Sequence, residues 1–298
     1  MPVLTHPAEL RLWCERVSAS GLTVGLVPTM GALHAGHLSL IRRARAECDR
    51  TVVSIFVNPT QFAPGEDFER YPRTPAADLA LCEAEGVGMV YLPPAEAVYP
   101  EGFATRVRVV GPVAETLEGA HRPGHLEGVA TVVAKLLIAA RPDRAYFGRK
   151  DAQQCALVRR LARDLDVGTT VVECETVRDP DGLALSSRNG YLDAAARAQA
   201  LAIPAALAAA ARLHEAGERD ASRLIEAAVR RLAESPALSV DYAAAVDPDT
   251  FEPLATVTGR CGIVIAARIA GTRLIDSVML GADAGLAIGN VGCPSPRP

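Results

Sequence analysis

Short apolar runs alternate with helical patterns along the first 176 residues. Five runs rich in β-branched residues predict strands at 22–29, 51–58, 87–93, 144–148 and 169–176. Apolar residues at helical spacing predict helices between them at 37–49, 75–85, 127–141 and 150–165. Thr74 and Pro75 suit the start of the second helix, and Gly86 and Gly168 suit the ends of the second and the fourth. Near-continuous apolar strands separated by helices predict an α/β fold, a Rossmann-like parallel sheet with helices on both faces.

The pattern changes after residue 176. Residues 194–234 are rich in alanine and predict helix, with a kink at Pro204. The stretches 239–254 and 262–280 predict strands joined by a polar loop. We therefore expect a Rossmann-like domain over 1–176, a smaller C-terminal α+β lid domain over 177–290, and a disordered tail over 291–298.

Three polar clusters each follow a predicted strand, HAGH at 34–37, VNPTQF at 57–62 and FGRKD at 147–151. Ligands of open parallel sheets bind beyond the carboxyl ends of the strands, where loops lead into helices. The three clusters should therefore meet at one edge of the sheet.

His34 and His37 lie where the first strand gives way to a helix. The free N–H groups and the dipole at a helix N-terminus favour anions, and Gly31 and Gly36 would let a ligand approach the backbone closely. Taken alone, the HxGH motif is more often a structural histidine pair. Its position between strand and helix favours a seat for a polyphosphate instead.

Other polar side chains fit the same site, although each also has a simpler explanation. Lys150 is a flexible point charge suited to phosphate, whereas a lone lysine at a helix start is more often solvated. Asp151 could cap that helix or engage a substrate hydroxyl. The sequence LSSRNG at 185–190 offers two hydroxyls and a guanidinium, or is a polar turn. Gln61 and Gln154 could hold hydroxyls and a carboxylate without adding charge, or simply lie at the surface.

Four further residues are explained without a ligand. Asn58 precedes a proline and fits turn chemistry, and Tyr71 fits packing under a proline-rich loop. His121 and His125 follow no strand, so we expect them to be loop residues near the mouth of the cleft.

Composition and charge exclude several classes of protein. The net charge is −4 and the basic residues are dispersed, so nucleic acid is not an expected partner. The first residues lack the basic and apolar segments of a signal peptide, and the apolar stretch 129–140 is too short to span a membrane. The seven cysteines are scattered, which indicates reduced thiols in a cytoplasmic protein. Neither a P-loop nor a GxGxxG after the first strand is present.

Five ordered blocks carry a resemblance that covers nearly the whole chain: PTMGALHAGHLSLI, SIFVNPTQF, YPRT, FGRKDAQQ and LSSRN. In this order they closely resemble the pantothenate synthetase (pantoate–β-alanine ligase) family, within the HxGH nucleotidyltransferases. The resemblance implies an ATP-dependent ligase of pantothenate biosynthesis that joins pantoate to β-alanine through a pantoyl adenylate. It also implies a homodimer that requires Mg²⁺.

The resemblance further implies roles for particular residues. Those that would act in catalysis are His37, His34, Lys150 and Arg188, with His37 the usual proton donor. ATP would contact Met30, His34, His37, Gly148, Lys150, Asp151, Val177, Ser186, Ser187 and Arg188. Pantoate and β-alanine would contact Gln61, Gln154, Asn58 and Tyr71.

Two positions depart from the family pattern. Leu185 stands where methionine is common, a swap of similar volume that should be tolerated. Arg149 stands where an acidic residue or glutamine is usual. Two other functions stay open, an adenylyltransferase that transfers AMP to a phosphate and a non-catalytic nucleotide-binding protein.

Overall fold

The computed structural model describes residues 1–281, and within them the chain divides into two compact units. The first unit consists of Met1–Val177, Leu185–Gly190 and Asp249–Phe251, and the second holds the rest. Residues 185–190, which the sequence pattern places in the second domain, thus pack with the first. The predicted tail at 291–298 and the end of the predicted second domain, 282–290, lie outside the described residues.

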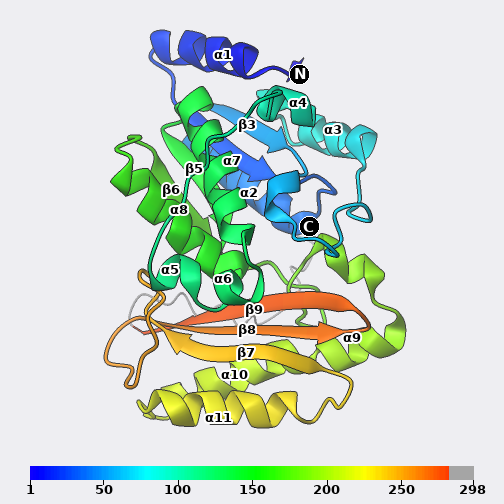
Figure 1. Cartoon of the computed structure of the whole chain (residues 1–298), viewed down its shortest axis with the longest axis vertical. Helices are drawn as coiled ribbons and strands as arrows, with labels where there is room; N and C mark the ends of the chain where they lie inside the picture. The colour runs from blue at the N-terminus through cyan, green and yellow to red at the C-terminus, as the bar shows by residue number, and fades with distance from the viewer. Residues whose placement is uncertain (282–298) are drawn as a thin grey trace, which may run out of the picture. The chain divides into compact units, whose positions relative to one another are not determined.

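A six-stranded parallel sheet forms the centre of the first unit (Figure 1). Its strands are, in spatial order, β1 (Val3–Leu4), β4 (Met89–Tyr91), β3 (Arg50–Ile55), β2 (Val24–Thr29), β5 (Arg144–Gly148) and β6 (Thr170–Cys174). All neighbouring strands pair in parallel. The predicted fold class is confirmed. The chain leaves β2 toward β3 and later returns on its other side at β5, so β2 is where the strand order reverses, the usual place for a ligand in such sheets.

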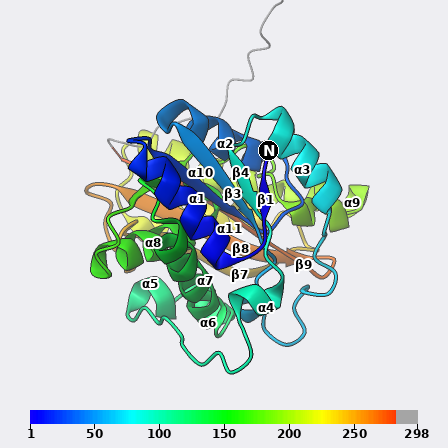
Figure 2. The same cartoon turned by 90° about the horizontal axis from the view of Figure 1, so that it is seen from above.

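Helices cover both faces of this sheet (Figure 2). One face carries α2 (Ala35–Glu47) and α3 (Pro75–Ala84). Leu40 and Ile41 of α2 pack there against Val27 and Val53 of the sheet. The opposite face carries α1 (Pro7–Ala19), α7 (His125–Ala140) and α8 (Ala152–Asp164). Because both faces are covered, the strands are apolar along nearly their whole length.

Several elements were not predicted. They are the short strand β1, the helix α1 and three one-turn helices, α4 (Ala95–Val98), α5 (Pro112–Glu115) and α6 (Glu118–His121). One predicted helix end is also wrong. Gly86 follows α3 with a φ of 66°, as expected, but α8 ends sooner than predicted and Asp166, with a φ of 50°, takes the left-handed position after it. Gly168 lies two residues further on.

The second unit packs three helices with a three-stranded antiparallel sheet. The helices are α9 (Ala194–Ala200), α10 (Ala202–Glu215) and α11 (Ala221–Leu232), and the strands are β7 (Ser239–Val246), β8 (Cys261–Ile269) and β9 (Thr272–Leu280). The stretch 262–280 forms two strands because Ala270 and Gly271, both with positive φ, turn the chain between them. The alanine-rich helix breaks at Leu201, because Pro204 has no N–H to donate to the carbonyl of Ala200 and its ring crowds that carbonyl.

One helical stretch of the described residues, Ala194–Glu215, is long and apolar enough to cross a membrane by length and composition. Its buried side chains, including Ile203, Leu207 and Ala210, belong to the hydrophobic core of the second unit. There they pack with residues of β8 and β9, so this stretch has the place of a core helix.

Candidate functional site

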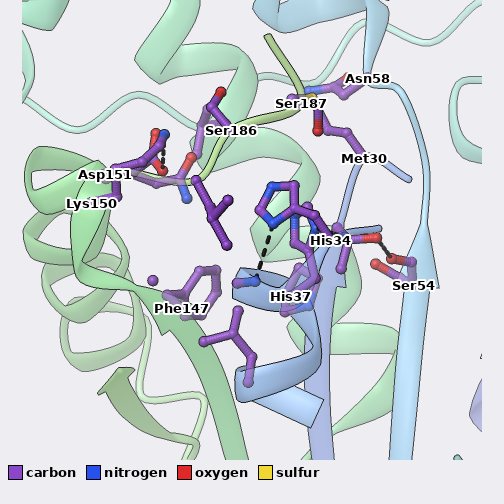
Figure 3. A pocket seen from close by; sticks show the side chains of 18 of the residues that line it. Met30, His34, His37, Ser54, Asn58, Phe147, Lys150, Asp151, Ser186 and Ser187 are labelled. Atoms are coloured by element: carbon purple, nitrogen blue, oxygen red, sulfur yellow. Dashed lines mark hydrogen bonds and ion pairs between the residues drawn. The ribbon is translucent and has the colours of Figure 1, made fainter. Parts of the chain in front are cut away.

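A cavity of the first unit opens at the carboxyl ends of β2, β3, β5 and β6 (Figure 3). All of the site residues proposed from the sequence line it: Met30, His34, His37, Asn58, Gln61, Tyr71, Gly148, Lys150, Asp151, Gln154, Val177, Ser186, Ser187 and Arg188. The parallel sheet therefore brings together segments from five parts of the chain. The roles assigned to these residues stay predictions.

The two histidines are fixed by the backbone at the start of α2. Nδ1 of His34 accepts the N–H of Gly36 at 3.2 Å, and Nδ1 of His37 accepts the N–H of His34 at 3.4 Å. Each neutral ring must then carry its proton on Nε2. A Cβ on Gly36 would lie 2.9 Å from Cε1 of His34, so a side chain at this position would displace the His34 ring from its hydrogen bond.

The imidazole of His37 is uncharged at neutral pH. Burial, together with the nearby charges of His34 and Lys150, lowers the pKa of His37 to about 3. The two rings pack at a tilt of 32° with their centroids 4.1 Å apart, an approach that two imidazolium ions would resist. His37 can therefore donate a hydrogen bond from Nε2 without adding a positive charge.

Lys150 and Asp151 form a charge pair in the 3₁₀ turn η2 (Arg149–Asp151), just after β5. The Lys150 Nζ lies 3.0 Å from Oδ2 of Asp151. Burial would raise the pKa of Asp151, but the Lys150 ammonium outweighs it and holds this pKa below its usual range. Figure 3 shows the pair on the opposite side of the cavity from Met30 and Ser187. The pair presents an ammonium to one wall of the cavity.

The loop 185–190 reaches the same cavity from a distant part of the sequence. Ser187 Oγ donates to the carbonyl of Ala32 at 3.4 Å. Arg188 makes a bidentate pair with Asp67, at 2.7 and 2.8 Å, and its guanidinium lies 5.5 Å from the ring centre of Tyr71. Burial opposes the charge on Arg188, but Asp67 more than offsets it and raises the pKa of Arg188. Arg188, which the family resemblance predicts to bind phosphate, is thus paired with the carboxylate of Asp67 in this structure.

Gln61 is held by Asn58. Nδ2 of Asn58 donates to Oε1 of Gln61 and to the carbonyl of Gly128, both at 3.1 Å, and its Oδ1 accepts from Tyr99 at 2.8 Å. The side chain of Asn58 is thus engaged within the protein. Asn58 also lines the cavity, and its contact with substrate stays a prediction.

The prediction for His121 and His125 is wrong. His121 ends α6 and His125 begins α7, so neither is a loop residue, and neither lines the cavity. The sequence shows no sign of this helix before His125, because the single turn of α6 has too few residues to show a helical spacing of apolar positions.

Sequence reasoning also missed Asp78 of α3. This buried carboxylate accepts the N–H groups of Ala32 at 3.0 Å and Leu33 at 2.8 Å. It thereby fixes the segment before His34, where Ala32 has a φ of 48°. The available signal was an aspartate on the apolar face of the predicted helix at 75–85.

The residues that line the cavity fit Mg²⁺ only as an ion shared with the phosphates of a substrate. No cluster of three His, Cys, Asp or Glu side chains that could hold a metal occurs among residues 1–281. Asp151 and Glu175 are the carboxylates that line the cavity. Mg²⁺ commonly uses one or two carboxylates together with substrate phosphates. The site therefore suits an ion that arrives with a nucleotide.

The comparisons with known proteins agree with this geometry. A sequence model of the family described as pantoate-beta-alanine ligase matches residues 2–279. The chain belongs to this family. A pantothenate synthetase from Acidobacterium capsulatum is 55% identical over 259 residues, which are 87% of this chain and 86% of that protein. The family predicted from the sequence is confirmed.

Solved structures of pantoate–β-alanine ligases share the fold. The pantothenate synthetase from Thermus thermophilus is 46% identical with a TM-score of 0.87, and the alignment covers 93% of this chain and 99% of that one. The ligase from Francisella tularensis, solved with beta-gamma ATP and beta-alanine, is 32% identical with a TM-score of 0.76. That alignment covers 94% of this chain and 97% of the other.

The two departures from the ligase pattern are accommodated locally. Leu185 lines the cavity, where an apolar side chain of similar volume fits. Arg149 pairs with Glu175 and Glu173, so its charge is neutralised beside the cavity. Both substitutions leave Lys150 and Ser186 among the lining residues.

Proposed function

We propose that this chain condenses pantoate with β-alanine to give pantothenate, AMP and pyrophosphate. The carboxylate of pantoate attacks the α-phosphorus of ATP, which forms pantoyl adenylate and releases pyrophosphate. The amine of β-alanine then attacks the acyl carbon and displaces AMP. The observation that supports this most is that His34, His37, Lys150 and the loop 185–190 share one cavity with Gln61 and Gln154.

The first step has to bring two anions together. A carboxylate is already ionised at neutral pH, so the attack requires no general base. Lys150, the Nε2–H groups of His34 and His37, and the positive end of the α2 dipole stabilise the charge that builds on the phosphates. Arg188 joins them when it exchanges Asp67 for phosphate. Holding the reactants in line contributes up to about 7–11 kcal/mol for a well-oriented pair.

The remaining wall of the cavity suits a branched hydroxy acid. Val129, Val133 and Leu136 of α7 line it with apolar surface. The amides of Gln61 and Gln154 then bind the hydroxyls and the carboxylate of pantoate, and Gln61 also contacts β-alanine. Neutral amides suit this task because they leave the carboxylate free of a tight ion pair before it attacks.

Further proposals follow from the sequence and the family. The second unit acts as a lid that keeps water from the adenylate. Asp151 and Glu175 line the cavity and would hold Mg²⁺ together with the ATP phosphates, where the ion would neutralise phosphate charge. The enzyme is a homodimer and works in the cytoplasm, in keeping with six free, buried cysteines among the described residues.

Product analysis with ATP, Mg²⁺, pantoate and β-alanine tests the proposal. We expect AMP and pantothenate in equal amounts, with continued AMP release only when β-alanine is present. A stable dinucleotide product would indicate an adenylyltransferase instead. Nucleotide binding without turnover in the complete mixture would indicate a binding protein.

A further inference from the structure

The turn that carries Gln61, η1 (Pro59–Gln61), is pressed against the first turns of α7. A Cβ built on Gly128 of α7 would lie 2.3 Å from the carbonyl oxygen of Thr60, so only glycine permits this approach. The carbonyl of Gly128 also accepts from Asn58, which itself holds the Gln61 amide. The start of α7 is therefore the support on which Gln61 rests.

His125, the first residue of α7, bonds directly to this turn. Its Nδ1 lies 2.9 Å from the backbone oxygen of Gln61, and its Nε2 lies 2.9 Å from Nη1 of Arg122. A guanidinium can only donate, so Nε2 must accept and Nδ1 must carry the proton that it donates to Gln61. Burial and the charge of Arg122 lower the pKa of His125 to about 4, which keeps the ring in this neutral form.

Arg122 is itself fixed from the other side. Its Nε and Nη2 donate to the two carboxylate oxygens of Glu66, at 2.7 and 2.8 Å. Only 11% of the Arg122 side chain is exposed. A row of hydrogen bonds thus runs from Glu66 through Arg122 and His125 to the backbone of Gln61. The row ties the segment after Gln61 to the start of α7.

We propose that His125 is a positioning residue for the acid substrate, which acts by holding the backbone of Gln61 so that its amide faces the cavity. This inference rests on the proposed function, in which Gln61 binds pantoate. His125 does not line the cavity, and its hydrogen bond to the backbone of Gln61 is the contact that links it to the acid substrate. A displacement of about 1 Å in a substrate-positioning group can lower the rate about 10²-fold.

Three substitutions distinguish the contributions of the two hydrogen bonds that the His125 ring makes, to Gln61 and to Arg122. His125→Asn keeps a donor near the place of Nδ1, and His125→Gln reaches toward Arg122 but loses the donor to Gln61. His125→Phe keeps only the shape. We expect His125→Gln and His125→Phe to raise the KM for pantoate about 10-fold or more, with the KM for ATP nearly unchanged. In His125→Asn the KM for pantoate should stay close to that of the unaltered chain.

Pantoate-dependent exchange of pyrophosphate into ATP measures both KM values in the complete chain. His121→Asn, at an exposed position outside the cavity, is the matched control and should match the unaltered chain. An unchanged pantoate KM in His125→Gln, or equal changes in both KM values, would overturn the inference alone. If His125→Phe does not fold, the comparison of Asn with Gln decides. An unaltered chain without pantoate-dependent exchange would overturn the proposed function itself.

Discussion

The pair of histidines shows how backbone geometry sets side-chain chemistry. His34 and His37 each accept a backbone N–H through Nδ1, so neither ring can turn that nitrogen to a ligand. The low pKa of His37 means that it would enter the proposed reaction as a neutral donor. Neutral donors stabilise developing phosphate charge without repelling the Lys150 ammonium in the same cavity. This favours hydrogen bonding to phosphate over proton transfer as the first task of His37.

The predicted effect of His37→Ala is a fall of about 10²- to 10³-fold in the rate of pyrophosphate–ATP exchange, the usual cost of removing one preorganised donor. His37→Gln, which can place an N–H near the lost Nε2, should recover part of that rate. Exchange kinetics with saturating pantoate measure the effect. Normal exchange in a folded His37→Ala variant would remove this residue from the chemistry.

Asp78 of α3 holds the backbone just before His34, so we expect a change at Asp78 to alter the binding of the nucleotide. In Asp78→Asn an amide N–H₂ would face one of the two N–H groups that the carboxylate now accepts. We expect a loss of about 1–3 kcal/mol in the free energy of unfolding and a higher KM for ATP. Urea unfolding followed by fluorescence of Trp13, the single tryptophan, reports on the first unit. A destabilised variant with an unchanged KM for ATP would make Asp78 purely structural.

At the scale of elements, sequence patterns located what is local in the chain. The strand at 144–148 was predicted with the bounds of β5, because a short apolar run is followed there by glycine. The HxGH motif was found because both histidines and the glycine lie within one turn. The contacts of Asp78 and His125 could not be predicted from the sequence, because the backbone groups they bind lie 45 or more residues away in the chain. Such contacts depend on strand order, which periodicity does not determine.

Asp67, in the segment after β3, pairs with the Arg188 guanidinium in the cavity. Asp67 binds Arg188 through two hydrogen bonds, so in the proposed function a triphosphate would have to compete with a carboxylate for that guanidinium. We expect Asp67→Asn to lower the Kd for a non-hydrolysable ATP analogue about 3- to 10-fold, the scale of one partly exposed ion pair. Calorimetric titration measures the Kd.

Asp164→Asn is the matched control for Asp67, because Asp164 pairs with Arg163 at an exposed place at the end of α8. It should leave the Kd unchanged. Weaker binding in Asp67→Asn would show instead that Asp67 is needed to hold Arg188 in place for the nucleotide.

For the molecule as a whole, two half-buried neutral histidines tie stability to pH. His37 and His125 have pKa values of about 3 and about 4, below the ordinary value of 6.5. As the pH falls below about 6.5, the unfolded chain gains protons that the folded chain does not bind. The stabilisation from each neutral ring is therefore complete above that pH and declines as the medium becomes acidic.

We predict that the free energy of unfolding of the first unit falls by about 2 kcal/mol for each of these rings between pH 7 and pH 5. His125→Gln should lose less over the same interval, because glutamine takes up no proton. Trp13 fluorescence in urea at both pH values measures the difference. Equal losses of free energy in the unaltered chain and in the variant would contradict a His125 that stays neutral in the folded chain.

The proposed reaction requires that ATP activates a carboxylic acid in the cavity before any amine takes part. Exchange of labelled pyrophosphate into ATP tests this most directly. We predict exchange that requires pantoate, needs no β-alanine, and is lost in a folded Lys150→Ala variant. Exchange that proceeds without pantoate, or that starts only when β-alanine is added, would contradict the account.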